Sequence, residues 1–284
     1  MRERSRVVCE TIPGISMSNL LVLCAFTAFA LFLIAREQKF AAIAGWACMM
    51  LNLWSEIPAL LAENNFLYPA RALLSLPFLA ISAERLLRED TAVLQLSRTA
   101  AIATIIYLPF TLVPFLNEAL ISLVITLAFG LITSLGHHPV MLAWDVMTEN
   151  SFSNQIILAC TGITAIALML GIAFGERTLS RMQAVLAFLL VVPLLFLLNL
   201  VRVVVLFISV SDAWFGAWYD PTGTGDANFF WVHNVLAEGL GILFLLALTW
   251  LLVRMIPPLG IFARNLVKAY RDSLLSFLRS KPIH

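Results

Sequence analysis

The stretch Leu194–Val210, LLFLLNLVRVVVLFISV, is an almost unbroken apolar run that contains a single arginine, Arg202. Such a run predicts a membrane-spanning helix, because about 20 apolar residues cross the hydrocarbon core of a bilayer. Asn199 lies three residues earlier, on the same helical face. A charge inside such a helix costs at least about 2.5–3.5 kcal/mol, so it usually marks a functional site. The alternative is an arginine that reaches the nearby interface and only anchors the helix.

The rest of the chain has the same apolar character. Of its 284 residues, 61% are hydrophobic and 12% are charged, whereas a soluble domain is about half apolar and a quarter charged. The composition therefore predicts an all-α fold, a polytopic transmembrane helical bundle of about eight helices. A net charge of +1 gives no indication of nucleic-acid binding. The predicted helices lie near residues 18–35, 40–62, 67–84, 98–115, 118–136, 154–174, 184–210 and 229–253.

The chain shows no division into separate domains at the level of sequence. Its first apolar run, Leu20–Ala35, is interpreted as a spanning helix rather than a signal peptide, because it is long and no cleavage site follows. No linker separates domains, so we predict a single integral membrane domain over residues 1–284. Residues 150–253 are its predicted catalytic core. Residues 260–284 are a predicted cytoplasmic tail, in which apolar and basic side chains alternate as in an amphipathic helix on a membrane surface.

Basic residues predict the orientation of the second half. Arg177 and Arg181 lie in the connection 175–183, and the C-terminal part of the chain adds six more basic residues. The connections 137–153 and 211–228 contain no Lys or Arg. Because cytoplasmic loops carry the excess of basic residues, the connection 175–183 and the C-terminus are predicted in the cytoplasm, and the other two connections outside.

The basic residues in the first half of the chain do not fit a simple alternation of helices. Basic residues at 36–39 and at 85–98 also favour the cytoplasm. Strict alternation of eight helices from a cytoplasmic N-terminus would place both groups outside. Either one segment between residues 98 and 153 does not cross the membrane simply, or the charge rule fails there.

A second polar group opens another apolar run, Leu158–Leu170, LACTGITAIALML, in which Cys160, Thr161 and Gly162 precede the apolar residues. A thiol near a helix N-terminus is favoured as the thiolate by the helix dipole. Thr161 has a hydroxyl for local hydrogen bonds, and Gly162 leaves space where a substrate backbone can approach. These residue types predict a reactive cysteine rather than a packing residue.

A third polar group begins the last spanning helix, where FFWVHNVLAEGLG contains His233 followed by Asn234. Cys160 is early in a helix that runs inward, Arg202 is late in the helix that runs outward, and His233 is early in the next inward helix. All three are therefore predicted near the same, extracytoplasmic, face. Acyl transfer needs such groups: a thiolate attacks a carbonyl, a histidine moves a proton, and a cation stabilises developing negative charge. The predicted supporting residues are Thr161, Gly162, Asn199 and Asn234.

Other polar residues are interpreted as structural, and neither a metal nor a cofactor is predicted. His137 and His138 lack a third ligand at a suitable spacing, so an interfacial loop is favoured over a metal site. The segment Asp220–Asp226 is similar to a calcium loop but lacks the bidentate glutamate, so a turn is favoured. Glu56 remains open as a pathway or packing group. The segment Gly171–Gly175, GIAFG, predicts close helix packing.

The three polar groups resemble the signatures of the exosortase/archaeosortase family. ACTG at Cys160, LLNLVR ending at Arg202, and HNVLAEG beginning at His233 occur in the family's order and on helices of the expected kind. The resemblance covers residues 150–253. The earlier segment ENNFLYPARALLSLPF, Glu63–Phe78, is more particularly similar to the archaeosortase A subfamily. A histidine in the third signature fits the broader family.

The resemblance implies a membrane-embedded cysteine transpeptidase with sortase-like chemistry, located in the cell membrane of an archaeon and facing the extracytoplasmic side. It implies substrates that are exported proteins with a C-terminal signal: a short motif, a transmembrane helix and a basic tail. For the archaeosortase A subfamily the motif is Pro-Gly-Phe, and S-layer glycoproteins are among the substrates. The signal is removed, and the mature protein is expected to be joined to a membrane lipid. By this resemblance Cys160 is the nucleophile, Arg202 stabilises the oxyanion or thiolate, and His233 is the acid and base.

Alternative functions are open at the level of sequence. A membrane transporter or channel, with Arg202 and Glu56 lining a pathway, predicts that Cys160→Ser is tolerated. An assembly protein would have no need for three polar groups at the same depth in the membrane. A hydrolytic intramembrane protease differs only in that water, rather than a lipid amine or hydroxyl, resolves the acyl-enzyme.

Overall fold

The computed structural model describes residues 17–35, 38–55, 57–58, 67–150, 152–220 and 227–279. The chain forms two compact units, Met1–Asp90 and Thr91–His284. Each of the eight predicted apolar runs contains a helix, so the predicted all-α transmembrane bundle is confirmed.

The first unit is built from helices that pack through aromatic rings. Phe29, fully buried, meets Trp46 edge to face with ring centroids 5.6 Å apart, and Trp46 meets Phe78 at 5.2 Å. At one end, Lys39 Nζ forms a 3.0 Å ion pair with Glu89 Oε1, so the connections that follow the first and third helices lie together. The helices are α1 (Met17–Ile34), α2 (Lys39–Ser55) and α4 (Leu67–Leu87).

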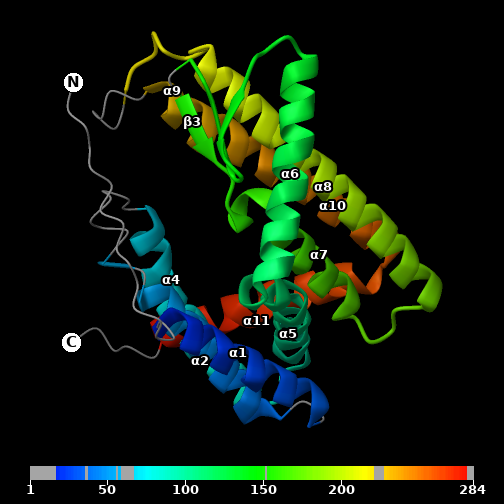
Figure 1. The fold of residues 1–284 in the computed structure, drawn as a ribbon. Helices are drawn as coiled ribbons and strands as arrows, with labels where there is room; N and C mark the ends of the chain where they lie inside the picture. The colour runs from blue at the N-terminus through cyan, green and yellow to red at the C-terminus, as the bar shows by residue number, and fades with distance from the viewer. Residues whose placement is uncertain are drawn as a thin grey trace, which may run out of the picture. The chain divides into compact units, whose positions relative to one another are not determined.

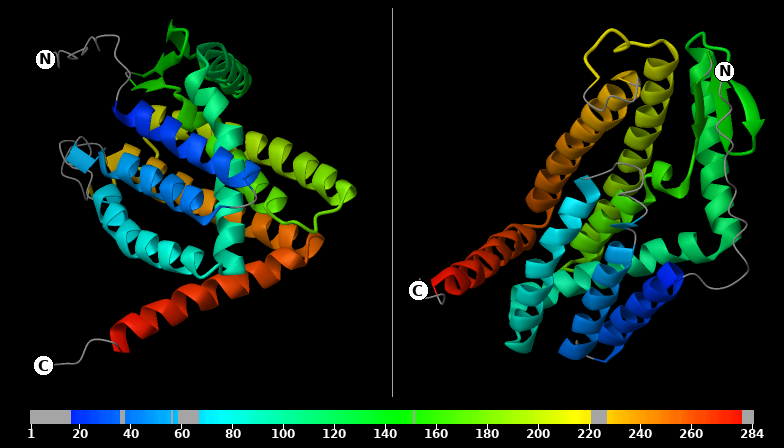
Figure 2. Two further views of the ribbon diagram at one scale, coloured as in Figure 1. Left: turned by 90° about the horizontal axis from the view of Figure 1, so that it is seen from below. Right: turned by 90° about the vertical axis from the view of Figure 1, so that its left-hand side faces the viewer.

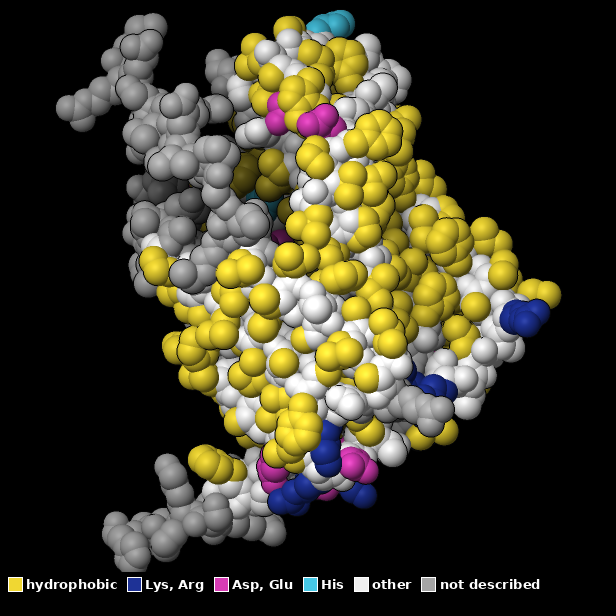
Figure 3. Space-filling view, turned by 60° about the horizontal axis from the view of Figure 1, so that its bottom comes forward, with side chains coloured by type: hydrophobic (Ala, Val, Ile, Leu, Met, Phe, Trp, Pro, Cys, Tyr) yellow, Lys and Arg dark blue, Asp and Glu magenta, His cyan; other side chains and the backbone are white. Residues whose placement is uncertain are grey.

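The second unit contains the longest apolar helices (Figure 1). Four segments of the described chain are long and apolar enough to span a membrane: Thr91–Leu112, Pro114–Ser134, Arg181–Ser211 and Ala227–Met255. Hydrophobic side chains predominate on the face drawn in Figure 3, as expected of a protein surrounded by lipid. The elements are α5 (Thr91–Leu112), α6 (Pro114–Ser134), β1 (Val140–Ala143), β2 (Val146–Glu149), β3 (Phe152–Gln155), the 3₁₀ turn η1 (Leu158–Thr161), α7 (Ile163–Phe174), α8 (Arg181–Ser211), α9 (Ala227–Phe229), the π-helical segment η2 (Phe230–Ala237), α10 (Glu238–Met255) and α11 (Pro258–Arg279).

Helix α8 and the continuous helix α9–η2–α10 lie side by side and run in opposite directions (Figure 1). Where the second begins, the Asn228 amide donates to the carbonyls of Ser209 and Val210, at 3.2 and 3.0 Å. Farther along, Leu248 and Val191 belong to one buried cluster. This antiparallel pair is the frame on which two of the three predicted catalytic groups are mounted.

One end of the second unit collects the connections predicted to be cytoplasmic. Arg98 Nη1 donates to the Gly175 carbonyl at 2.8 Å, and Gln183 Nε2 donates to the Met255 carbonyl at 3.0 Å. The start of α5, the connection 175–180 and the junction of α10 with α11 are therefore neighbours.

The opposite end collects the connections predicted to be external. His137 Nε2 lies 3.8 Å from Asp212 Oδ2, and Asn150 Nδ2 donates to the Ser211 carbonyl at 3.5 Å. The segment after α6 and the segment after α8 therefore share this end. Their predicted grouping is confirmed.

The arrangement of helices α5 and α6 bears on the conflict that the basic residues raised. The first turns of α5 lie near the first end, where Arg98 meets Gly175, and α6 finishes at the second end, just before His137. The two helices are joined at Val113, which is extended (φ −102°, ψ 104°), and Pro114 occupies the first turn of α6. Figure 2 shows the change of direction between them. This arrangement favours the alternative in which a segment between residues 98 and 153 does not cross simply, and the charge rule then need not fail.

The helix predicted near 154–174 begins much later than expected. Residues 152–155 form β3, Cys160 lies in η1, and α7 begins only at Ile163. Gly162 has φ 79° and ψ −1°, a left-handed conformation through which a right-handed helix does not continue. The prediction that Cys160 lies inside the head of a long helix is therefore wrong, because a tight turn separates the thiol from α7.

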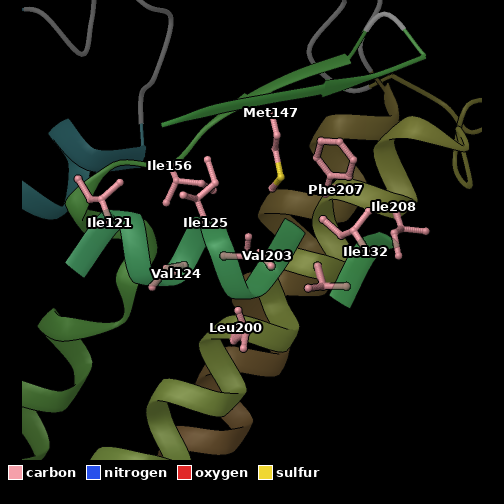
Figure 4. Close-up of a cluster of buried hydrophobic side chains, with 12 residues drawn as sticks. Ile121, Val124, Ile125, Ile132, Met147, Ile156, Leu200, Val203, Phe207 and Ile208 are labelled. Carbon is pink, nitrogen blue, oxygen red and sulfur yellow. The ribbon is translucent and has the colours of Figure 1, made fainter. Parts of the chain in front are cut away.

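The prediction of a loop over 137–153 is also wrong. This segment contributes to a three-stranded antiparallel sheet in the order β1-β2-β3. Each strand is only four residues long, too short to show a clear alternation in the sequence. Met147, and Ile156 just after β3, reach from the sheet toward side chains of α6 and α8 and are almost fully buried (Figure 4). The sheet therefore covers the ends of these two helices.

The predicted close packing at Gly171–Gly175 is confirmed. A Cβ at Gly171 would lie 2.6 Å from the Thr99 carbonyl oxygen, and one at Gly175 would lie 2.6 Å from Thr99 Oγ1. No side chain fits at these distances, so the two glycines allow α7 to lie directly against α5.

A carboxylate joins α5 to the connection between α7 and α8. Glu176 accepts hydrogen bonds from Gln95 Nε2 at 2.8 Å and from the Thr178 amide and hydroxyl at 3.0 and 2.8 Å. Burial acts to raise the pKa of Glu176, but these hydrogen bonds and the charge of Arg98 outweigh it and lower the pKa below its ordinary value.

This lowered pKa predicts a loss of stability in acid. The contribution of Glu176 should be complete above the ordinary carboxyl pKa of about 4.3 and should disappear as the pH falls through the lower pKa of the folded state. We expect Glu176→Gln to lower the Tm at neutral pH and to leave it unchanged in strong acid. The test is the Tm of both proteins in detergent between about pH 3 and pH 7. A difference that stays constant over this range would contradict the assignment.

Candidate active site

Cys160 lies in the turn η1, between the sheet and α7. Its side chain is half-buried and packs against the cluster formed by α6, α8 and the sheet. Its amide donates to the Ile157 carbonyl at 2.8 Å, and its own carbonyl accepts a 2.7 Å hydrogen bond from Asn199 Nδ2 on α8. The backbone of the cysteine is thus fixed from both sides.

Thr161 and Gly162 complete this turn. Thr161 is 1% exposed; its hydroxyl donates to the Leu158 carbonyl at 2.7 Å and accepts from the Ile163 amide at 3.4 Å. A Cβ built on Gly162 would lie 2.9 Å from Asn199 Cβ. The glycine is therefore required both by its positive φ and by the close approach of Asn199.

Alanine substitutions test this turn. We expect Gly162→Ala to lower the Tm clearly, because it adds a contact at 2.9 Å to a positive-φ cost of about 1–2 kcal/mol. Gly136→Ala isolates the φ effect, since Gly136 has φ 92° and no other described atom lies within 4 Å of its added Cβ. Gly130→Ala, within α6 and equally uncrowded in the described structure, should be neutral or slightly stabilising. Equal Tm values for Gly162→Ala and Gly136→Ala would contradict the packing role of Asn199.

Arg202 lies on α8 one turn after Asn199, about 4.5 Å farther along the helix axis. It continues the stripe of Val191, Leu195 and Leu198, whose side chains pack with α7 and α10. Its guanidinium is half-buried and forms no hydrogen bond or ion pair with the described part of the chain. The stripe thus carries a charged group on the face of α8 that packs with α7 and α10.

His233 lies in η2, where the helix widens into a π-helical segment. Its ring stacks on Phe229, with centroids 5.0 Å apart and planes inclined by 13°. Segments of π-helix are rare and often occur at functional sites. This widening was not predicted from the sequence, since helical periodicity does not distinguish the two forms.

The antiparallel pair formed by α8 and the helix α9–η2–α10 determines the positions of the three groups along the axis of α8. Arg202 precedes the contact of Ser209 and Val210 with Asn228 by about 11 Å of helix, and His233 follows it by about 7 Å in the opposite direction. His233 is therefore within about 4 Å of the level of Arg202 along α8. Cys160, bonded to Asn199, lies on the other side of Arg202 at a similar separation. The backbones of the three residues fall within about two turns of α8.

One pair of the predicted site residues is joined by a hydrogen bond in the described structure. The Asn199–Cys160 hydrogen bond is direct, whereas Arg202 and His233 are positioned by the elements that carry them, α8 and η2. Asn234 is on η2, but its side chain lies outside the described structure, as do Glu56 and residues 221–226.

The histidine pair after α6 has a structural contact that the sequence did not predict. His137 Nδ1 lies 3.2 Å from Glu149 Oε2, and the His138 amide donates to Glu149 Oε1 at 2.7 Å. Together with Asp212, these residues connect the sheet to the end of α8. Within the described residues, no cluster of three or more His, Cys, Asp or Glu side chains could hold a metal ion.

Comparisons with known proteins show the family of the chain. A protein-family model described as transmembrane exosortase matches residues 16–237, a range that includes Cys160, Arg202 and His233. The chain belongs to the transmembrane exosortase family, as the sequence motifs predicted.

Two archaeal relatives are more particularly similar. Archaeosortase A of Haloferax volcanii is 29% identical over 191 residues, which cover 58% of this chain and 62% of the relative. Archaeosortase A of Natronomonas pharaonis is 26% identical over 200 residues, which cover 62% of each protein. The matched part spans less than two thirds of either relative's length. No solved structure matches the chain.

Proposed function

We propose that this protein is a membrane-embedded cysteine transpeptidase that cleaves a C-terminal sorting signal from exported proteins. The observation that carries the proposal is the hydrogen bond from Asn199 to the Cys160 carbonyl, one helical turn from Arg202. It holds the turn bearing the thiol against the helix that bears the guanidinium. Membership of the exosortase family and similarity to two archaeosortases support the same function.

The proposed reaction begins when the Cys160 thiolate attacks the carbonyl carbon of the scissile peptide bond. Arg202 stabilises the oxyanion that forms, and His233 donates a proton to the leaving amine as the C–N bond breaks. The mature protein is then held as a thioester on Cys160. A lipid amine or hydroxyl attacks this thioester while His233 accepts its proton, and the thiolate leaves.

The proposed site faces the extracytoplasmic side. Arg177 and Arg181 lie in or beside the connection at the end opposite the sheet, and the described residues 137–150, 152–153 and 211–220 at the sheet end contain no Lys or Arg. Cytoplasmic loops carry the excess of basic residues, which supports a cytoplasmic position for the first end. At the sheet end the site is accessible to proteins that have already been exported, and to lipids of the outer leaflet.

The proposed substrates are exported proteins that end in a short motif, a transmembrane helix and a basic tail, with S-layer glycoproteins among the candidates. The similarity to archaeosortases supports this class and an archaeal cell membrane. A Pro-Gly-Phe motif is the first to test.

The experiment is cleavage of such a candidate by the full chain in liposomes of archaeal lipid. The new C-terminus is identified by mass spectrometry: a lipid adduct supports transfer, and a free carboxylate indicates hydrolysis. The alternative function, a transporter or channel with Arg202 lining the pathway, forms no covalent intermediate. Intact candidate protein after incubation, with flux of a solute through the same liposomes, would favour that alternative.

A further inference from the structure

The strand β3 presents an open edge next to the candidate active site. The Ile156 amide donates to the Asp145 carbonyl at 2.8 Å, so the main chain of Ile156 faces β2. In an antiparallel ladder this orientation alternates along the strand. Asn154, paired with Met147, therefore also faces β2, whereas the amides and carbonyls of Ser153 and Gln155 point away from it.

These outward groups are available for hydrogen bonding. In the strand order β1-β2-β3 no further described strand follows β3. The side chains of Ser153 and Gln155 are exposed, and their main-chain groups have no hydrogen-bond partner elsewhere in the described chain. An unpaired strand edge is a template for another extended chain.

The same strand leads directly to the thiol. Ile157 continues the extended backbone with φ −106° and ψ 171°, and η1 then carries the chain to Cys160. Two extended residues and one short turn span about 13 Å between Gln155 and Cys160. A peptide paired with the edge of β3 would thus reach the thiol after about four residues.

The opposite edge of the sheet is less suitable. Because β2 lies between them, β1 is about 10 Å from β3, the strand that leads directly to Cys160. Val140 and Leu142 on β1 are 59% and 63% exposed and apolar, which suits contact with lipid. The last three residues of β3, Ser-Asn-Gln, are polar, which suits an edge that meets water and peptide groups.

We propose that the edge of β3 binds the substrate: an extended peptide segment adjoining the scissile bond adds to the sheet through main-chain hydrogen bonds to Ser153 and Gln155. This inference rests on the proposed function and specifies how the same site holds its substrate. Main-chain pairing does not depend on the side chains of the peptide, so different exported proteins can bind in one register. The register brings a peptide carbonyl to Cys160.

Photo-crosslinking tests the position of the substrate. The cross-linker p-benzoylphenylalanine is placed at Ser153 or Gln155 in a full-length Cys160→Ala chain, which binds but does not cleave. The probe is the exported protein cleaved by the unsubstituted chain, and the matched control is the same cross-linker at Leu142 on β1. We expect cross-links to the probe from β3 and not from β1. Cross-links mainly from Leu142, from neither edge, or to a second copy of this chain would overturn the proposal.

Proline substitution tests the hydrogen bonds themselves. Ser153→Pro removes an outward amide but no main-chain bond to β2; it also removes the 3.1 Å hydrogen bond from the Ser153 hydroxyl to Thr148 Oγ1 on β2, which Ser153→Ala removes alone. Relative to Ser153→Ala, we expect KM to rise about 3- to 10-fold with kcat little changed. Met141→Pro is the matched control on β1, because the alternation that points Met147 toward β3 points the Met141 amide away from β2. Its KM should be unchanged. Equal KM values for the two proline variants, at equal Tm, would overturn the proposal.

The experiments distinguish failure of the β3 proposal from failure of the proposed function. If the unsubstituted chain cleaves the probe but the β3 results are negative, the proposed function stands and the docking strand is wrong. If Cys160→Ala cleaves the probe as well as the unsubstituted chain, the proposed function is wrong, and the docking inference fails with it.

Discussion

Replacement of Cys160 by alanine is expected to reduce substrate cleavage by at least about 10³-fold, because removal of a nucleophile leaves no covalent route. The thiol is half-buried and its carbonyl is fixed by Asn199, so the smaller side chain should leave the turn intact. The measurement is single-turnover cleavage in liposomes, with the Tm as a check of folding.

Cys48→Ala is the matched control for this prediction. Cys48 is also a free, half-buried cysteine, but it lies on α2 in the first unit and is not one of the candidate site residues. We expect its cleavage rate to equal that of the unsubstituted chain. Activity in Cys160→Ala, or equal loss in both variants, would exclude a nucleophilic role for Cys160.

Arg202→Gln is expected to lower kcat by about 10²–10³-fold with a smaller change in KM, since a group that stabilises an oxyanion acts mainly in the transition state. Arg202→Lys should recover only part of this loss, because lysine keeps the charge but not the planar donor geometry. Steady-state kinetics separates the two constants, provided that chemistry is slower than substrate release.

Arg254→Gln provides the control for a membrane arginine without a catalytic role. Arg254 ends α10, and its guanidinium lies 4.7 Å from the centroid of the Trp250 ring. We expect this variant to keep its kcat. If the loss of kcat in Arg202→Gln only matched the loss of folded protein shown by a lower Tm, Arg202 would be a structural anchor. That is the alternative interpretation of the sequence.

The sequence by itself determined the helices, the family and the candidate residues. Apolar runs such as Leu194–Val210 specify helices without tertiary information, because within lipid a chain must satisfy its own backbone hydrogen bonds locally. The motifs at Cys160, Arg202 and His233 are local as well, and they were sufficient to identify the family that residues 16–237 match.

Only the tertiary structure decided how the cysteine is held. Its partner Asn199 is 39 residues away in the chain, and no periodicity encodes a contact at that separation. The turn at Gly162 depends on the same contact, since a glycine in a sequence does not reveal whether its φ is positive.

The sheet and the directions of α5 and α6 also depend on the tertiary structure. Four-residue strands become stable only when paired and packed on a hydrophobic surface, here the ends of α6 and α8. The side on which α5 begins is fixed by the bond from Arg98 to Gly175, which joins distant segments. Local composition specifies what can form a helix in lipid, whereas the positions of turns, strands and ends depend on which distant groups meet.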